Sequence, residues 1–304
     1  MQKIRAFVRI TRAPFLTAVI IPTLLGAMIA LRERRFHVWY FLLTLLGSMC
    51  VNIALNVSND YFDHLSGNDA SNRELTPFSG GSRTIQDGVL TPRQVLAVSV
   101  LFFLLTALIG LYLAWARGWA LLLVGALGMF VAFFHNAPPI NLYRLAPGLG
   151  ELAAGIGCGP LVVLGSYFVQ VQRFSLEALS VSIPVGLLIS AVLYINEFPD
   201  YWADKAAGKK TLVVELGKQR AVWGYVALLV AAYLTIVVGV LVRIFPWTVL
   251  LGLLSSPFAY LAIRGAFRDY DNTQKLIPTN ALTVQVHLLT GLLLCVGYAI
   301  APAV

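Results

Sequence analysis

The chain has 304 residues, of which 59% are hydrophobic and only 12% are charged. A soluble domain carries roughly twice this charged fraction, so the composition excludes an ordinary soluble enzyme. The formal net charge of +8 does not indicate a nucleic-acid-binding protein, because most of the basic residues fall in loops on one side of the predicted membrane spans.

Apolar segments recur along the whole chain, and about 20 such residues suffice to cross the hydrocarbon core of a bilayer. The basic N-terminus, MQKIRAFVRITRAPF, precedes the first segment. Because this segment lacks a cleavage pattern of small residues, we expect an uncleaved helix and not a signal peptide. The predicted spans are, in chain order, 13–31, 38–58, 94–115, 118–135, 149–170, 178–196, 222–242, 245–264 and 283–302. The sequence therefore predicts an all-α integral membrane protein, a single bundle of nine transmembrane helices.

The basic residues predict the orientation of these helices. With the N-terminus in the cytoplasm, 16 of the 22 Lys and Arg residues lie on the cytoplasmic side and 6 on the other. This distribution follows the positive-inside rule, with one discordant loop, RERR at 32–35. Cys50, Cys158 and Cys295 lie inside apolar spans without metal-ligand spacing, and we interpret them as small core residues.

A stripe of polar side chains begins near the end of the second predicted span and continues into the segment SNDYFDHLSGND at 58–69. These residues are three or four positions apart, so on a helix they share one face. They are Asn52, Asn56, Asn59, Asp60 and Asp63. A second stripe with the same four-residue step, Asn196, Asp200 and Asp204, follows the sixth span. Both stripes follow even-numbered spans, which predicts that both face the cytoplasm.

Acidic residues concentrate around these two stripes. Nine of the 14 fall in two short windows: Asp60, Asp63, Asp69, Glu74 and Asp87, and then Glu197, Asp200, Asp204 and Glu215. Carboxylates stacked on a helix repel one another unless a cation lies between them, and helix C-termini add negative potential at the same place. Hard oxygen ligands of this kind hold Mg²⁺ together with substrate phosphates. The alternative is a pair of solvated acidic helix ends.

Basic residues and glycines follow both stripes, as a phosphate site requires. Arg73 and Arg83 come after the first, and the segment DKAAGKKT carries Lys205, Lys209 and Lys210 after the second. Lysine and arginine neutralise a bound diphosphate and stabilise it as it leaves. Gly80 and Gly81, in TPFSGGSRT, would let backbone N–H groups approach such a ligand.

With these motifs, the sequence resembles the UbiA superfamily of intramembrane prenyltransferases. The resemblance extends over nearly the whole chain and rests on the segments NDYFD, PFSGGSR, APPINLYRLAPGLGE, NEFPDYWADKAAGKKTLVVELG and VHLLTGLLL. It is greatest to the 1,4-dihydroxy-2-naphthoate prenyltransferases of menaquinone biosynthesis. It implies one transmembrane domain over 1–304 around a central cavity, with cytoplasmic cap loops at about 61–92 and 199–221.

The resemblance also implies roles for individual residues. Metal binding falls to Asn59, Asp60, Asp63, Asp69, Asn196, Asp200 and Asp204, of which Asp60, Asp63, Asp200 and Asp204 are expected to be catalytic. Diphosphate binding falls to Asn59, Arg73, Arg83, Arg144, Asn196, Lys205 and Lys209. Two Mg²⁺ ions are expected, with Mn²⁺ as a substitute, and the prenyl chain is expected to lie in an apolar tunnel open to lipid.

The sequence departs from the family pattern at two places. In the family's N-x-x-x-D-x-x-x-D pattern, Asn59 and Asp63 match the first two positions. The third position, an acid in the family, is Gly67 here, and Asp69 is expected to substitute for it. His135 and Asn136 replace the usual Tyr and Ser or Thr before APP, and we assign them with Glu151 to the acceptor pocket. His287 is interpreted as a packing residue.

The expected activity is Mg²⁺-dependent transfer of a polyprenyl group from an isoprenyl diphosphate to an aromatic acceptor, in a prokaryotic inner membrane and with no obligatory protein partner. The expected acceptor is 1,4-dihydroxy-2-naphthoate, with 4-hydroxybenzoate and homogentisate as alternatives. A CDP-alcohol phosphotransferase would need a D-G-x-x-A-R stretch, which the sequence lacks. A transporter with an intramembrane carboxylate site would place its acids near the bilayer midplane, and not at one mouth. A structural or partner-binding membrane subunit remains the third alternative.

Overall fold

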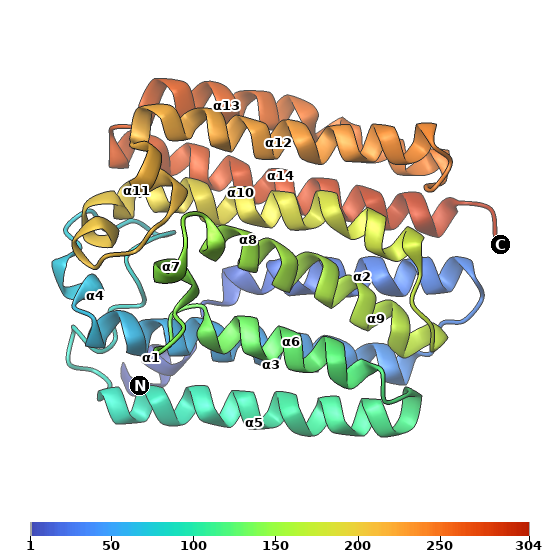
Figure 1. Ribbon diagram of the computed structural model, residues 1–304, viewed down its shortest axis with the longest axis horizontal. Helices are drawn as coiled ribbons and strands as arrows, with labels where there is room; N and C mark the ends of the chain where they lie inside the picture. The colour runs from blue at the N-terminus through green and yellow to red at the C-terminus, as the bar shows by residue number, and fades with distance from the viewer. Residues whose placement is uncertain (1, 304) are drawn as a thin grey trace.

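The computed structural model describes residues 2–303, and side chains from residue 6 onward. Long helices lie side by side as one bundle (Figure 1). They are α1 (Gln2–Ile10), η1 (Ala13–Leu16), α2 (Thr17–Arg32), α3 (Val38–Leu65), α4 (Asn68–Ser71), α5 (Pro92–Arg117), α6 (Leu121–Phe134), α7 (Leu142–Leu145), α8 (Leu149–Ile156), η2 (Gly157–Leu161), α9 (Val162–Val171), α10 (Leu176–Ala206), α11 (Leu212–Leu216), α12 (Lys218–Leu241), η3 (Trp247–Ser255), α13 (Ser256–Asp269) and α14 (Thr273–Ile300). Among the described residues, the one β-type pairing is an isolated bridge between Thr76 and Ser79.

Within residues 2–303, eight helical segments are long and apolar enough to cross a membrane. The prediction of an all-α, multi-pass membrane protein is therefore confirmed. The fourth predicted span corresponds to α6, an apolar helix of 14 residues that is shorter than the other eight.

The helices around the two polar stripes run further than the sequence suggested. The second predicted span ended at residue 58, but α3 continues to Leu65; the sixth ended at 196, but α10 continues to Ala206. The cap segments are correspondingly shorter than 61–92 and 199–221. The outer positions of the predicted domain, residues 1 and 304, lie outside the described residues.

Small residues let the helices approach closely. A Cβ on Gly159 of η2 would lie 2.6 Å from the Cα of Gly186 in α10, so these two backbones are in contact. A Cβ on Gly26 of α2 would likewise lie 2.5 Å from the carbonyl oxygen of Val163. Small residues are the usual means by which membrane helices pack, because lipid supplies no hydrophobic drive between them.

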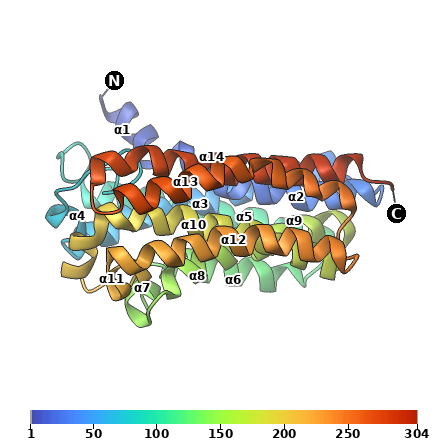
Figure 2. The ribbon, with the colours of Figure 1, turned by 90° about the horizontal axis from the view of Figure 1, so that it is seen from above.

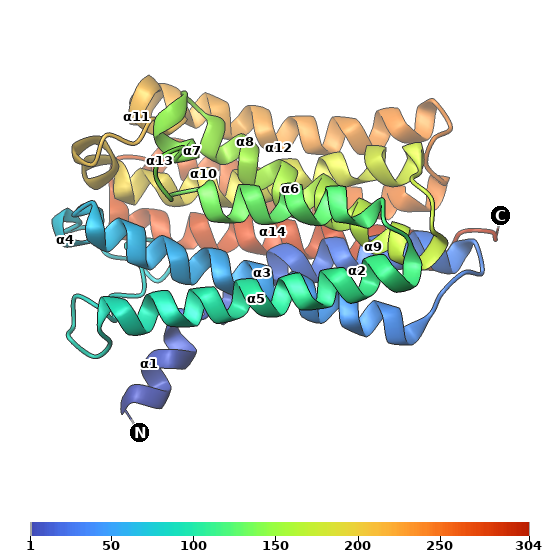
Figure 3. The same ribbon diagram turned by 60° about the horizontal axis from the view of Figure 1, so that its bottom comes forward.

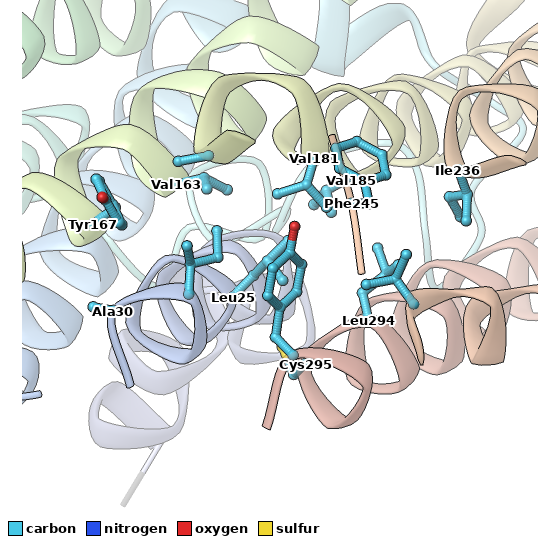
Figure 4. Packing of buried hydrophobic residues seen from close by; sticks show 14 of the residues in the cluster. Leu25, Ala30, Val163, Tyr167, Val181, Val185, Ile236, Phe245, Leu294 and Cys295 are labelled. Atoms are coloured by element: carbon cyan, nitrogen blue, oxygen red, sulfur yellow. The ribbon is translucent and has the colours of Figure 1, made fainter. Parts of the chain in front are cut away.

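A buried apolar cluster joins α2, α9, α10 and α14 (Figure 4). Leu25, Val163, Val185 and Leu294 are among its members. The cluster packs α10, which carries the second polar stripe, together with α2, the first long apolar helix.

The short elements α4, α7 and α11 gather at one end of the bundle, which we call the motif end (Figures 1 and 2). The N-terminal helix α1 also lies toward this end, and the C-terminus lies at the opposite end (Figure 3).

Candidate active site

The first polar stripe faces the interior at the end of α3. Asn52, Asn56, Asp60 and Asp63 are all buried, and Asn59 is half-buried. Asn56 donates from Nδ2 to Asn52 Oδ1 over 3.0 Å, whereas Asn59 Oδ1 is buried without a partner. Because the helix continues through the motif, the four-residue spacing places these side chains in one column, as predicted.

Gly67 reverses the chain after α3. Its φ of +75° is left-handed, which glycine adopts without strain, and α4 begins at the next residue. Asp69 is thereby buried beside the first stripe. Burial raises the pKa of Asp69 to about 8, and the charges of Asp63 and Asp60 act in the same direction. Gly67, which departs from the family pattern, therefore forms the turn that places Asp69 beside the first stripe.

Gly81 permits the following loop to approach Asp69. A Cβ at Gly81 would lie 2.7 Å from Oδ2 and 2.8 Å from Oδ1 of that carboxylate, so a larger residue would displace it. Gln86 also donates from Nε2 to Asp69 Oδ2 over 3.3 Å. Of the glycine pair noted in the sequence, Gly81 therefore fits closely against an acidic side chain of the protein.

The second polar stripe meets the segment that follows the first stripe, at and just after α4, across the bundle. Asn72 donates from Nδ2 to Asp200 Oδ1 over 2.6 Å, and Asn68 donates from Nδ2 to Asp204 Oδ1 over 3.1 Å. Asp204 is buried and Asp200 is half-buried. Segments more than 120 residues apart in sequence therefore form one carboxylate cluster at the motif end.

Lys209 lies between the two stripes. Its Nζ is 3.1 Å from Asp63 Oδ1 and 3.3 Å from Asp204 Oδ1, and its side chain is only 8% exposed. Burial disfavours the ammonium, but the charges of Asp204 and Asp63 outweigh burial and hold the pKa of Lys209 above its usual value. Asp63 from the first stripe and Asp204 from the second therefore both contact one cation position, which the Lys209 ammonium occupies.

Asp60 has a different environment from Asp63. It accepts an ion-paired hydrogen bond from Arg12, which lies between α1 and η1, and a 3.2 Å bond from the backbone N–H of Ser82. Arg12 has a left-handed φ of 47°, an uncommon conformation for a non-glycine residue that clusters at functional sites. From the sequence, Arg12 is only one of the basic residues that predict the membrane orientation, because residue spacing does not link it to Asp60, 48 positions away.

The predicted basic ligands divide into two groups. Lys209 lies within the cluster, and Arg83 is half-buried and donates to the backbone carbonyl of Asp69. By contrast, Arg73 and Arg144 are exposed, and Lys205 points away, with its Nζ 5.7 Å from the centre of the Trp202 ring. The structure brings only the first group to the carboxylates.

The predicted acceptor residues also separate. Asn136 is 3.5 Å from Asp63 Oδ2, and the ring of His135 lies edge-on to Tyr143 with centroids 4.6 Å apart. Glu151 instead accepts a 2.6 Å hydrogen bond from the backbone N–H of Leu212 and so anchors α11. Glu151 therefore holds a neighbouring segment in place at the start of α11.

Three asparagines of the site were not predicted from the sequence. Asn68 and Asn72 repeat the four-residue step after Gly67, and that spacing could have revealed them. Asn280 of α14 donates to Asn196 Oδ1 over 2.7 Å, and nothing in its local sequence signals this contact.

A cavity of about 300 Å³ adjoins the carboxylate cluster. Asn56, Asn196 and His135 line it near the motif end, and most of its other lining side chains are apolar. Gly110 of α5 and Gly125 and Gly128 of α6 also line it, and a Cβ added at any of the three would meet no atom within 4 Å. The cavity therefore combines a polar head with a long apolar interior.

The donors at the motif end fit a divalent cation that shares its coordination with a ligand. Asp60 Oδ2, Asn59 Oδ1 and Asn68 Oδ1 are buried oxygens without hydrogen-bond donors. Across residues 2–303, no three His, Cys, Asp or Glu side chains converge closely enough to hold a metal ion by themselves. Such a set suits Mg²⁺, which keeps waters and takes phosphate oxygens as further ligands.

Comparison with known proteins identifies relatives over the full length. The sequence model of the UbiA prenyltransferase family matches residues 19–279. The 2-carboxy-1,4-naphthoquinone phytyltransferase of Synechocystis sp. is 30% identical over 94% of this chain and 91% of that protein. The 1,4-dihydroxy-2-naphthoate octaprenyltransferase of Bacillus subtilis is 29% identical over 96% of this chain and 92% of that protein.

Solved structures show the same fold. A UbiA homologue from Aeropyrum pernix superimposes with a TM-score of 0.69 at 18% identity, over 91% of this chain and 97% of that one. A UbiA homologue from Archaeoglobus fulgidus, bound to GPP and Mg²⁺, has a TM-score of 0.62 at 14% identity, over 98% of this chain and 100% of that one.

Proposed function

The chain belongs to the UbiA prenyltransferase family, and on that premise we propose that it transfers a prenyl group from an isoprenyl diphosphate to 1,4-dihydroxy-2-naphthoate. One observation carries the proposal. Asp63 and Asp204, one from each stripe, contact the same cation position, and this position adjoins an apolar cavity.

The residues proposed to hold Mg²⁺ are Asn59, Asp60, Asp63, Asp69, Asn196, Asp200 and Asp204. When bound, two Mg²⁺ ions would supply Lewis-acid neutralisation of the diphosphate oxygens. Lys209 and Arg83 are basic side chains at the cluster. We propose that they neutralise the negative charge of the departing diphosphate. Arg73, Arg144 and Lys205 would need to move to contribute.

The cavity is proposed to hold the prenyl chain. Its α3 lining runs from Asn56 to Thr44, which at 1.5 Å per residue is about 18 Å. An isoprene unit has four main-chain bonds and extends about 5 Å, so the enclosed length holds about four units. Its apolar walls exclude water, which would otherwise capture the allylic cation.

The proposed reaction replaces the acceptor carboxylate by the prenyl group. The allylic C–O bond breaks with its electron pair on the diphosphate, and an electron-rich ring carbon forms the new C–C bond. The carboxylate leaves as CO₂ and its bonding pair returns to the ring, so no net proton is released. A negatively charged acceptor suits a site that also contains Lys209, Arg12 and Arg83.

We propose that α6 completes nine membrane crossings, with the motif end in the cytoplasm of a prokaryotic inner membrane. The opposite positions of the termini and the excess of basic residues in the loops of the motif end support this orientation (Figure 1). Reporter fusions in the loops 73–90 and 207–211 should both report the cytoplasm. A fusion pair reporting opposite sides would exclude both the topology and a shared site.

The activity is tested with purified protein, Mg²⁺ and a prenyl diphosphate. The acceptors 1,4-dihydroxy-2-naphthoate, 4-hydroxybenzoate and homogentisate are supplied separately, and lipid products are identified by mass. We expect a prenylated, decarboxylated product from the naphthoate alone. Prenylation of hydroxybenzoate alone, with its carboxylate retained, would contradict the naphthoate assignment and leave prenyl transfer intact.

A further inference from the structure

Two buried histidines line the cavity with unpaired ring nitrogens. His135 is 6% exposed and His287 is 2% exposed, and the Nδ1 atom of each has no hydrogen-bond partner. Most buried side-chain polar atoms in native proteins have a partner, so an unpaired one needs an explanation. Two such atoms therefore belong to residues in the wall of one cavity.

The histidines reach the cavity from different walls. His135 follows α6, which packs against α3, α5 and α9, whereas His287 lies on α14, which packs against α2 and α10. Thr17 is close to His287, with its carbonyl oxygen 3.4 Å from Nε2. Asn56 and Asn196, which belong to the two motif stripes, line the same cavity. A ligand between the histidines would therefore lie beside the carboxylate cluster.

A packing role alone does not account for His287. Thr283 and Thr290, which also lie on α14, each have a hydroxyl partner, Tyr225 over 2.6 Å and Ser255 over 2.6 Å. His287 has one long contact and one unpaired nitrogen, although it faces a cavity with room for a ligand.

We propose that His135 and His287 form the binding site for the hydroxyl groups of the aromatic acceptor. This inference rests on the proposed function only in requiring an acceptor with a hydroxylated ring. An imidazole nitrogen accepts a hydrogen bond from a phenolic O–H or donates one to its oxygen, according to its tautomer. The ring then lies at the polar head of the cavity, between the carboxylate cluster and the apolar interior that takes the prenyl chain.

The test measures acceptor binding directly, without turnover. Purified wild type, His135→Leu and His287→Leu are compared by equilibrium dialysis with 1,4-dihydroxy-2-naphthoate and, separately, with 4-hydroxybenzoate. Loss of a hydrogen bond to a buried nitrogen should raise the naphthoate Kd about tenfold to a hundredfold in each leucine variant. His287→Asn, which keeps a hydrogen-bonding side chain, should remain within about threefold of wild type.

Three measurements separate binding from damage to the fold. The KM for the prenyl diphosphate and the thermal midpoint should stay near wild type in both leucine variants. Thr235→Val is the matched control, because Thr235 lies on α12 outside the cavity lining and its hydroxyl donates to the backbone carbonyl of Ala231 over 2.7 Å. This variant should leave the naphthoate Kd unchanged.

Unchanged acceptor Kd values in both leucine variants would overturn the inference, as would a wild type that binds neither aromatic compound. Naphthoate binding that depends on the histidines but leads to no prenylated product would support this site and refute the proposed function. The two proposals therefore fail by different results.

Discussion

Removal of the Lys209 ammonium should destabilise the metal-free protein and make it unusually responsive to divalent cations. In Lys209→Met, Asp63 and Asp204 lose the cation that lies 3.1 Å and 3.3 Å from their oxygens. Breaking a buried ion pair from one side costs about 3–5 kcal/mol, because the remaining charge stays buried. Since one carboxylate can take up a proton instead, we expect a loss of about 3 kcal/mol. At about 2 °C per kcal/mol, the midpoint falls by about 6 °C.

The pH dependence of this contribution follows from the sign of the shift. The pKa of Lys209 is raised above the ordinary value of 10.5, so its stabilisation is fully present below that pH and declines only above it. The comparison can therefore be made at neutral pH. A divalent cation supplies the missing charge without having to displace the ammonium, so Mg²⁺ or Mn²⁺ should stabilise the variant by more than it stabilises wild type.

The assay is thermal unfolding of the purified protein in detergent, with chelator and with increasing Mn²⁺. Lys205→Met is the control, because Lys205 is exposed and lies over the Trp202 ring. Equal midpoints for wild type and Lys209→Met in chelator would refute the reasoning. Equal stabilisation of both proteins by Mn²⁺ would refute the placement of the cation site between the motifs.

Three further predictions concern the cluster and the cavity. Asp200→Ala should reduce turnover by several orders of magnitude at saturating Mg²⁺. The control Asp87→Ala removes an exposed ion pair with Arg9 and should keep normal turnover. Full turnover by Asp200→Ala in chelator would exclude the mechanism. Gly128→Leu should shift the preference toward shorter prenyl diphosphates in competition assays, because the added side chain enters the cavity. Ala126→Leu, outside the cavity lining, should leave the preference unchanged. An unchanged preference in Gly128→Leu would place the prenyl chain outside this cavity. Because the pKa of Asp69 is raised to about 8, its proton competes with metal, so Mn²⁺ affinity should increase up to about tenfold per pH unit from pH 6 to 8. Asp69→Asn should flatten that dependence, and a slope that persists in this variant would assign the proton to another group.

The sequence by itself determined the class of fold and the two motifs. Membrane helices must satisfy their backbone hydrogen bonds internally, so their composition and length identify them without tertiary information. The four-residue step of Asn196, Asp200 and Asp204 likewise follows from helix geometry alone. The family resemblance added the expectation of a shared metal site.

Only the tertiary structure decided which charges meet. Lys209 enters the cluster and Lys205 does not, although they are four residues apart, because the chain turns between them after α10 ends. Arg12 pairs with Asp60 and Asn280 with Asn196 across long stretches of sequence. Contacts of this kind depend on how helices are arranged in the bundle, and residue spacing along one helix contains no information about its neighbours. For the same physical reason, the cavity between α3, α5, α6, α10 and α14, with His135 and His287 in its walls, became visible only in three dimensions.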